Sequence, residues 1–220
     1  PDFVSLVVNE LKDQIVYYAP QNEPNAQSLA GFFLGIFPPG EKYSLKLFRR
    51  HVDNAADAFI VATKIIKKHS PNAQVMSVQN MINWEKAWWD FTGYFYELGQ
   101  EFNYHHLDKI KDHIDILGFN YYYRVKASPL PNPRIIDPEG LGVIMTALAE
   151  KYKKPLLLTE NGWADDKGDV KKEYFLKHVD VVKKMRKQVG LIGYFYWSLI
   201  DNYEWASGYT EKFGMYKLNS

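Results

Sequence analysis

Short apolar segments alternate with amphipathic segments along the chain, and this alternation limits the folds that the sequence can adopt. Strands are expected where β-branched, aromatic or leucine residues form short apolar runs, at 15–19, 73–78, 115–122, 156–159 and 191–197. Helices are expected where apolar residues recur at helical spacing, at 2–13, 44–69, 104–113, 140–152 and 170–188. Strands separated by helices predict a parallel sheet with helices on both faces, so the expected fold class is α/β.

The segments between these elements are expected to be irregular. A long loop is predicted after Pro20 up to the second helix, for which Ser44 is the expected N-cap. The aromatic segment 79–102 is also predicted to lack regular structure. No repeat or change in composition marks a second domain, so the sequence predicts a single domain.

A doubly wound sheet and a (β/α)8 barrel both fit this pattern, and two details favour the barrel. No G-x-G-x-x-G string follows the first strand, so the usual mark of a dinucleotide-binding sheet is absent. Barrel enzymes build their active sites at the carboxyl ends of the strands. Polar residues follow the expected strands at those ends, namely Asn22, Glu23, Asn83, Asn120, Glu160, Asn161 and Ser198.

Composition argues against several classes of function. The net charge is +1, which argues against nucleic acid or an anionic membrane as a partner. The chain has no cysteine, which excludes disulfides, thiolate catalysis and cysteine-ligated metals. The six histidines show no metal-ligand spacing, so we expect no metal and no cofactor. No apolar run approaches the roughly 20 residues of a membrane helix and no signal-peptide pattern is present, so we expect a cytoplasmic protein.

Two glutamates carry the expected chemistry. Glu23 follows the first strand and Glu160 follows the fourth, and each has an asparagine beside it. An isolated glutamate at such a place is more often an exposed loop residue or a helix-cap partner. Two carboxylates at equivalent strand ends instead favour glycoside hydrolysis, in which one protonates the leaving oxygen and the other attacks or activates water.

Four strings of the sequence resemble glycoside hydrolase family 1, the family of retaining β-glucosidases and β-galactosidases. They are N-E-P at 22–24, N-Y-Y at 120–122, T-E-N-G at 159–162 and W-S-L-I-D-N-Y-E-W at 197–205. Each string is short, but all four occur in the order of the family and each follows an expected strand. The resemblance covers nearly the whole chain, including F-P-P-G at 37–40 and P-E-G-L at 138–141.

The resemblance implies a (β/α)8 TIM barrel of which this chain supplies about strands 4 to 8. Residues 1–220 would form a single catalytic domain that lacks its first three strands and its last helix. The glutamine and histidine that the family takes from those strands for sugar hydroxyls have no counterpart here. An open sheet of five strands would expose two apolar edges, so a complementing chain segment or a homo-oligomer is an expected partner.

The resemblance also implies roles for the residues around the two glutamates. Glu23 would be the general acid/base and Glu160 the nucleophile that forms a covalent glycosyl–enzyme. Asn22 would bind the sugar 2-hydroxyl. Tyr122 would donate its hydroxyl to Glu160, and Asn120 would support that region.

The last motif implies the sugar-binding surface. Trp197 would form an apolar floor under the sugar ring, and Glu204 and Trp205 would bind its outer hydroxyls. Because Glu204 would repel a phosphate group, an unphosphorylated sugar is favoured. Trp84 and Trp163 are expected either on the leaving-group side or in packing.

These assignments predict a retaining β-glycosidase whose ligand is a small carbohydrate or an aryl or alkyl β-glycoside. The expected substrates are β-linked glucosides or galactosides, hydrolysed in two steps through a covalent intermediate. The alternative is a catalytically silent fragment or half-barrel that binds sugar weakly or needs a partner segment to complete its site.

Overall fold

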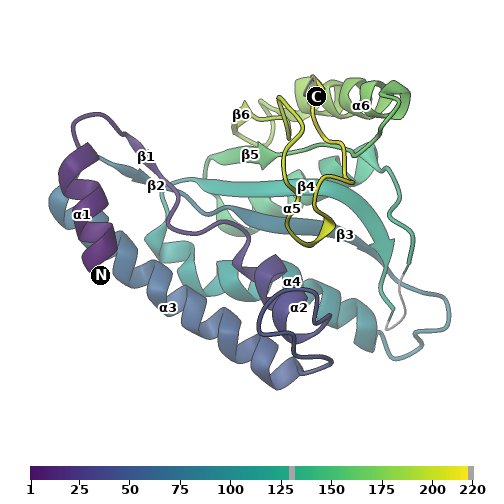
Figure 1. Cartoon of the computed structure of the whole chain (residues 1–220), viewed down its shortest axis with the longest axis horizontal. Helices are drawn as coiled ribbons and strands as arrows, with labels where there is room; N and C mark the ends of the chain where they lie inside the picture. The colour runs from purple at the N-terminus through teal and green to yellow at the C-terminus, as the bar shows by residue number, and fades with distance from the viewer. Residues whose placement is uncertain (129–131, 218–220) are drawn as a thin grey trace. The chain divides into compact units, whose positions relative to one another are not determined.

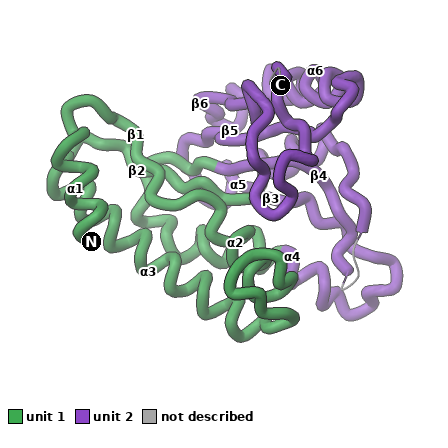
Figure 2. Tube along the Cα trace, in the orientation of Figure 1, with its two compact units in different colours: residues 1–80, 100–118 green, residues 81–99, 119–220 purple. Residues whose placement is uncertain are grey.

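The computed structural model describes residues 1–128 and 132–217. The chain divides into two compact units, coloured separately in Figure 2. Unit 1 contains residues 1–80 and 100–118, and unit 2 contains residues 81–99 and 119–220. The single catalytic domain expected over residues 1–220 stays a prediction.

Unit 1 combines helices with a two-stranded parallel sheet in which Tyr17 pairs with Gln74. Its elements alternate between helix and strand, as the hydrophobic pattern predicted. They are α1 Asp2–Leu11, β1 Tyr17–Tyr18, α2 Pro24–Phe32, α3 Leu45–His69, β2 Gln74–Val75, most of α4 Tyr94–Ile110, and the short 3-10 helix η1 Lys111–His113.

Helix α3 organises unit 1 because both α1 and α2 pack against it (Figure 1). Ser44 is its N-cap, as the sequence predicted, and the Ser44 hydroxyl accepts a hydrogen bond from the Leu47 N–H at 3.3 Å. Basic residues in its last turn suit the negative end of the helix dipole. The buried face of α3 consists of Phe48, Val52, Ala56, Phe59, Ala62, Thr63 and Ile66.

Unit 2 contains most of a four-stranded sheet whose strand order, β3-β4-β5-β6, follows the order of the chain, while the first residues of β3 and β4 belong to unit 1. Strands β5 and β6 are parallel, with Leu156 opposite Leu191, and α5 packs against both β5 and α6 (Figure 1). The α/β class predicted from the sequence is confirmed. The elements are β3 Gln79–Glu85, β4 Leu117–Lys126, α5 Pro138–Tyr152, β5 Leu156–Glu160, α6 Asp169–Met185, β6 Leu191–Tyr194 and the 3-10 helix η2 Trp205–Ser207.

The structure differs from the sequence prediction in two segments. Helix α2 occupies 24–32, where a loop was predicted, and Pro24 begins it because a proline ring fixes the backbone angle that a first helical residue needs. Strand β3 and the start of α4 occupy much of 79–102, which was predicted to be irregular. Asp90 starts α4 at Tyr94, since its carboxylate accepts hydrogen bonds from the backbone N–H groups of Phe95 and Tyr96, both at 3.1 Å.

The buried side chain of Asn161 fastens the end of β5 to its neighbours in unit 2. Its Nδ2 donates to the Tyr121 carbonyl on β4 at 2.6 Å and to the Tyr174 hydroxyl on α6 at 2.7 Å. Its Oδ1 accepts from the Tyr194 hydroxyl on β6 at 3.0 Å. The backbone carbonyl of Asn161 also accepts from the Trp197 N–H at 3.0 Å. The fully buried amide of Asn161, the residue after Glu160, therefore links the end of β5 to β4, α6 and β6.

Two histidines are buried without a full set of hydrogen-bond partners. His106 on α4 lies edge-on to Phe59, with ring centroids 6.0 Å apart, and neither of its ring nitrogens has a hydrogen-bond partner among the residues that the structure describes. His178 on α6 places Nδ1 2.8 Å from the Tyr174 carbonyl, and its Nε2 has no partner. Burial disfavours the charged ring and lowers the pKa of each histidine to about 4.

We expect the free energy of unfolding to fall as the pH drops from about 7 to about 5. In the unfolded chain each histidine takes up a proton near its ordinary pKa of about 6.5. In the folded chain His106 and His178 stay neutral down to about pH 4, so the unfolded state binds more protons in this window. Linkage then predicts a loss of up to about 2 kcal/mol per histidine at about pH 5, measurable by urea unfolding at several pH values.

The His106→Phe variant isolates this effect because it keeps an aromatic ring and removes the titrating group. Its unfolding free energy should depend less on pH than that of the wild type. The control is His69→Phe at the end of α3, a less buried position, which should keep the wild-type slope. An equally steep dependence in His106→Phe would contradict this explanation.

We expect Asn161→Ala to lower the free energy of unfolding by about 3 kcal/mol or more. The substitution removes three side-chain hydrogen bonds, to β4, α6 and β6, and each bond lost from such a network costs about 1–3 kcal/mol. The control is Asn132→Ala, which removes a bond near the surface to the Lys126 carbonyl at 3.3 Å and should cost under about 1 kcal/mol. Equal losses in urea unfolding of the two variants would show that the Asn161 bonds do not stabilise the fold.

Candidate active site

The two predicted catalytic glutamates belong to different compact units. Glu23 lies between β1 and α2 in unit 1, and Glu160 is the last residue of β5 in unit 2. Asn22 also lies in unit 1, where it is exposed. The other predicted site residues lie in unit 2; they are Trp84, Asn120, Tyr122, Trp163, Trp197, Glu204 and Trp205. Each part of the site is described within its own unit.

Glu23 lies in a turn in which its backbone has an unfavourable conformation. Its φ of 46° and ψ of 51° are left-handed, a conformation that is uncommon for a residue with a side chain. The Glu23 N–H donates to the Val78 carbonyl at 2.8 Å, which ties the turn to the segment after β2. Glu23 is also the N-cap residue of α2, where the positive end of the helix dipole favours negative charge. The turn thus holds a half-buried carboxyl group at a defined place.

Asn80, at the start of β3, contacts Glu23 and was missed by the sequence analysis. Its Nδ2 donates to Glu23 Oε1 at 2.7 Å. Asn25 holds the backbone of Asn80 from both sides, donating from Nδ2 to the Asn80 carbonyl at 2.7 Å and accepting at Oδ1 from its N–H at 3.3 Å. The N-E-P-N string at 22–25 is the one sequence signal for this arrangement, because it places a second asparagine just after Glu23.

Glu160 receives a hydrogen bond from a residue on the neighbouring strand. The Tyr122 hydroxyl on β4 donates to Glu160 Oε2 at 2.5 Å, so the contact expected from the sequence is present. A hydroxyl that donates to a carboxylate favours its ionised form. Tyr122 is itself fixed, because its carbonyl accepts from the Tyr174 hydroxyl at 2.9 Å and its ring packs edge-on against Phe213 at 5.9 Å between centroids.

Asn120 lies on the same strand as Tyr122 but is fully buried. Its Oδ1 accepts a hydrogen bond from the Thr159 hydroxyl at 2.6 Å, which joins β4 to β5 one residue before Glu160. This contact fits the expected supporting role, in which Asn120 acts on the position of its neighbours.

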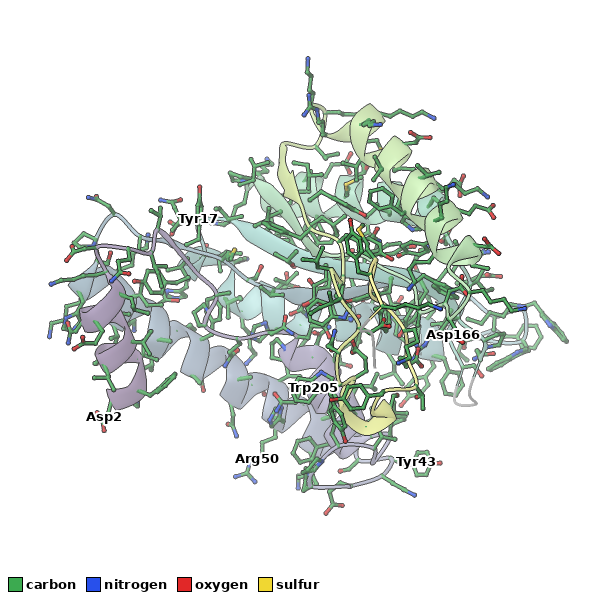
Figure 3. The ribbon with its side chains drawn as sticks, turned by 45° about the horizontal axis from the view of Figure 1, so that its top comes forward. Asp2, Tyr17, Tyr43, Arg50, Asp166 and Trp205 are labelled. Atoms are coloured by element: carbon green, nitrogen blue, oxygen red, sulfur yellow. The ribbon has the colours of Figure 1, made fainter. Side chains whose placement is uncertain are left out.

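Trp197 and Glu204 lie together in unit 2. The indole Nε1 of Trp197 donates to Glu204 Oε1 at 3.0 Å. Gly162 fits against this segment because a Cβ there would overlap the carbonyl oxygen of Trp197. Trp205, labelled in Figure 3, is 72% exposed. The structure therefore joins the predicted floor residue to one of the two predicted hydroxyl-binding residues and leaves Trp205 exposed.

Trp84 and Trp163, expected either on the leaving-group side or in packing, both make packing contacts. Trp163 stacks on Tyr174, with ring centroids 5.8 Å apart and an interplanar angle of 27°. The Trp84 ring lies so close to Gly99 on α4 that a Cβ at that glycine would overlap it. A leaving-group role for either tryptophan stays a prediction.

The chemistry of the two half-sites is that of carboxyl groups with neutral donors. Asn80 donates to Glu23 and Tyr122 donates to Glu160, and neither donor carries a charge. Within residues 1–128 and 132–217, no three His, Asp or Glu side chains are grouped so as to hold a metal ion. Across the same residues, no helix is both long and apolar enough to span a membrane.

Comparisons with known proteins match this site to one family. The sequence profile of glycosyl hydrolase family 1 matches residues 1–87 and 125–220. A beta-galactosidase of Saccharolobus solfataricus is 28% identical over 264 aligned residues, which cover 99% of this chain and 54% of that protein. Beta-glucosidase A of Thermotoga maritima is 27% identical over 275 aligned residues, which cover 97% of this chain and 61% of that protein.

The solved structures agree with the sequence relatives. The crystal structure of Fpglu1 from Fervidobacterium pennivoraus superposes on this chain with a TM-score of 0.89 at 27% identity. The superposition covers 99% of this chain and 55% of the Fpglu1 chain. The chain thus spans about half the length of the relatives it matches, and its sheet corresponds to part of their (β/α)8 barrel. The family profile covers most of the sequence, and the chain belongs to glycosyl hydrolase family 1.

Proposed function

We propose that this chain carries the catalytic glutamates of a retaining β-glycosidase that acts on β-linked glucosides or galactosides of unphosphorylated sugars. The observation that carries the proposal is the hydrogen bond from Tyr122 to Glu160, because a nucleophile must be ionised and a donated hydroxyl favours that form. Glu23 accepts a hydrogen bond from the neutral amide of Asn80 at the start of β3, and this arrangement suits the transfer of a proton. The names beta-galactosidase and beta-glucosidase among the relatives support the substrate class.

The proposed reaction has two steps in which each glutamate changes its protonation or bonding. In the first, a carboxylate oxygen of Glu160 attacks the anomeric carbon, the bond from that carbon to the leaving oxygen breaks, and Glu23 gives this oxygen its proton. In the second, Glu23 takes a proton from a water molecule whose oxygen attacks the same carbon. Glu160 then leaves as a carboxylate, and the sugar keeps its β configuration.

The proposed sugar contacts come from the segment after β6. The Trp197 ring offers a flat apolar surface to the C–H groups of a pyranose. Glu204 already accepts one hydrogen bond from Trp197, and its remaining acceptor positions can bind sugar hydroxyls. A negative charge at this place opposes a phosphorylated sugar, which is why the plain hexoside is proposed.

The second candidate is a catalytically silent chain that needs another segment to complete its site. Two observations favour it: the chain covers about half of its relatives, and apolar residues are exposed at one edge strand of each of the two sheets. Val16 and Tyr17 at β1 are 57% and 56% exposed, and Ile192 and Phe195 at β6 are 57% and 58% exposed. The proposed partner in that case is a complementing segment or a second copy of the chain, since open apolar edges bind other strands.

We expect the purified chain to release p-nitrophenol from p-nitrophenyl β-glucoside or β-galactoside and not from the α-glucoside. Glu160→Gly should abolish this turnover because no covalent intermediate can form. Azide should restore part of it and yield the α-glycosyl azide, because azide then attacks from the face that Glu160 has vacated.

Glu23→Ala is the variant to compare with Glu160→Gly in the same assay. In this variant Glu160 still forms the covalent intermediate, so azide attacks from the opposite face and should yield the β-glycosyl azide. NMR spectra of the products distinguish the two anomers. The same anomer from both variants would overturn the assigned roles, and absence of turnover by the folded wild-type chain would favour the silent alternative.

A further inference from the structure

The carboxyl group of Glu23 has two oxygens, and one of them is engaged by an amide. Asn80 Nδ2 lies 2.7 Å from Glu23 Oε1, within unit 1. The two residues are 57 positions apart in the sequence, so the contact is a product of the fold. A hydrogen bond of this length restricts the rotation of the carboxyl group and makes its two oxygens inequivalent.

We infer that Asn80 is a positioning residue that donates to Glu23 Oε1 and so fixes the orientation of the carboxyl group for the transfer of the proton. The inference rests on the proposed function, because it assigns Asn80 to the acid/base step of that reaction. Asn80 does not touch the substrate in this mechanism. It acts through Glu23 alone.

The chemistry of the amide suits a group that must work in both protonation states. A protonated carboxyl group has one acceptor oxygen and one hydroxyl, whereas a carboxylate has two acceptor oxygens. The N–H of Asn80 can donate to Oε1 in either state, so the bond survives while the proton leaves and returns. A lysine or arginine at position 80 would instead favour the carboxylate and weaken Glu23 as an acid.

Asn25 makes this arrangement stiff. It pairs with both backbone polar groups of Asn80 and also donates to the Phe102 carbonyl at 3.1 Å. Asn25 is 1% exposed and lies in the first turn of α2, the helix for which Glu23 is the N-cap residue. One buried side chain therefore fixes Asn80 relative to the turn that carries Glu23.

The test compares two leaving groups, because the need for a proton from Glu23 differs between them. Asn80→Ala should lower kcat/KM about tenfold or more for an alkyl β-glucoside, whose leaving oxygen must be protonated. For 2,4-dinitrophenyl β-glucoside, which departs as a stable anion, the loss should stay below about threefold. A loss of equal size for both substrates would overturn the inference, since it would reflect damage to the fold.

Gln79→Ala is the matched control for a buried amide in the same strand. Gln79 Nε2 donates to the Asn103 carbonyl at 3.1 Å and makes no hydrogen bond to Glu23. Its truncation should lower stability in urea unfolding and leave the ratio of the two kcat/KM values unchanged. A ratio that shifts as much in Gln79→Ala as in Asn80→Ala would also overturn the inference.

A second measurement requires no turnover. In wild-type protein the side-chain amide resonances of Asn80 should be displaced by the acceptor carboxyl and should exchange slowly with water. Glu23→Ala should return them toward free-amide positions, whereas the exposed control Glu10→Ala should not. If the chemical shifts of the Asn80 amide are unchanged in Glu23→Ala, the inference is overturned. Inactivity of the wild-type chain alone would count against the proposed function and leave this result to decide the position of Asn80.

Discussion

The hydrogen bonds of the Asn161 side chain set the surroundings of Glu160. A buried amide is costly unless both its donor and its acceptor groups are satisfied, and here they are satisfied by residues on β4, α6 and β6. Tyr174 takes part in the same network and also holds the backbone of Tyr122. The hydroxyl that contacts Glu160 is therefore placed by the polar core of unit 2, so changes within that core affect the proposed nucleophile without contacting it.

Each of the two glutamates accepts a hydrogen bond from a neutral side chain, and the chemical type of that donor differs between them. Tyr122 gives Glu160 a phenolic hydroxyl, and Asn80 gives Glu23 an amide. A phenol is the more acidic of the two donors, so it supports a carboxylate that stays ionised until it forms a bond. The amide is the weaker donor and favours the carboxylate less, which suits the proposed alternation of Glu23 between its two protonation states. Two chemically identical side chains thus have different surroundings, as the two proposed roles require.

Local patterns were enough to predict the class of the fold and to single out both glutamates as candidates, because an apolar run and the polar residue that ends it are neighbours in the sequence. Asn80 and Asn25 escaped prediction because their contact exists only after β3 comes to lie beside the turn at Glu23. Helix α2 escaped for a different reason. Its sequence includes Asn25 and Gly31, both poor helix formers, so packing against α3 rather than propensity explains its presence.

The left-handed backbone at Glu23 has a consequence for how this chain can change. Glycine adopts such angles freely, whereas a residue with a Cβ loses roughly 1 kcal/mol or more there. A glycine at position 23 would relieve that strain, so folding alone does not explain a glutamate there. Replacing Glu23 by glycine would therefore make the chain more stable and remove the proposed acid/base.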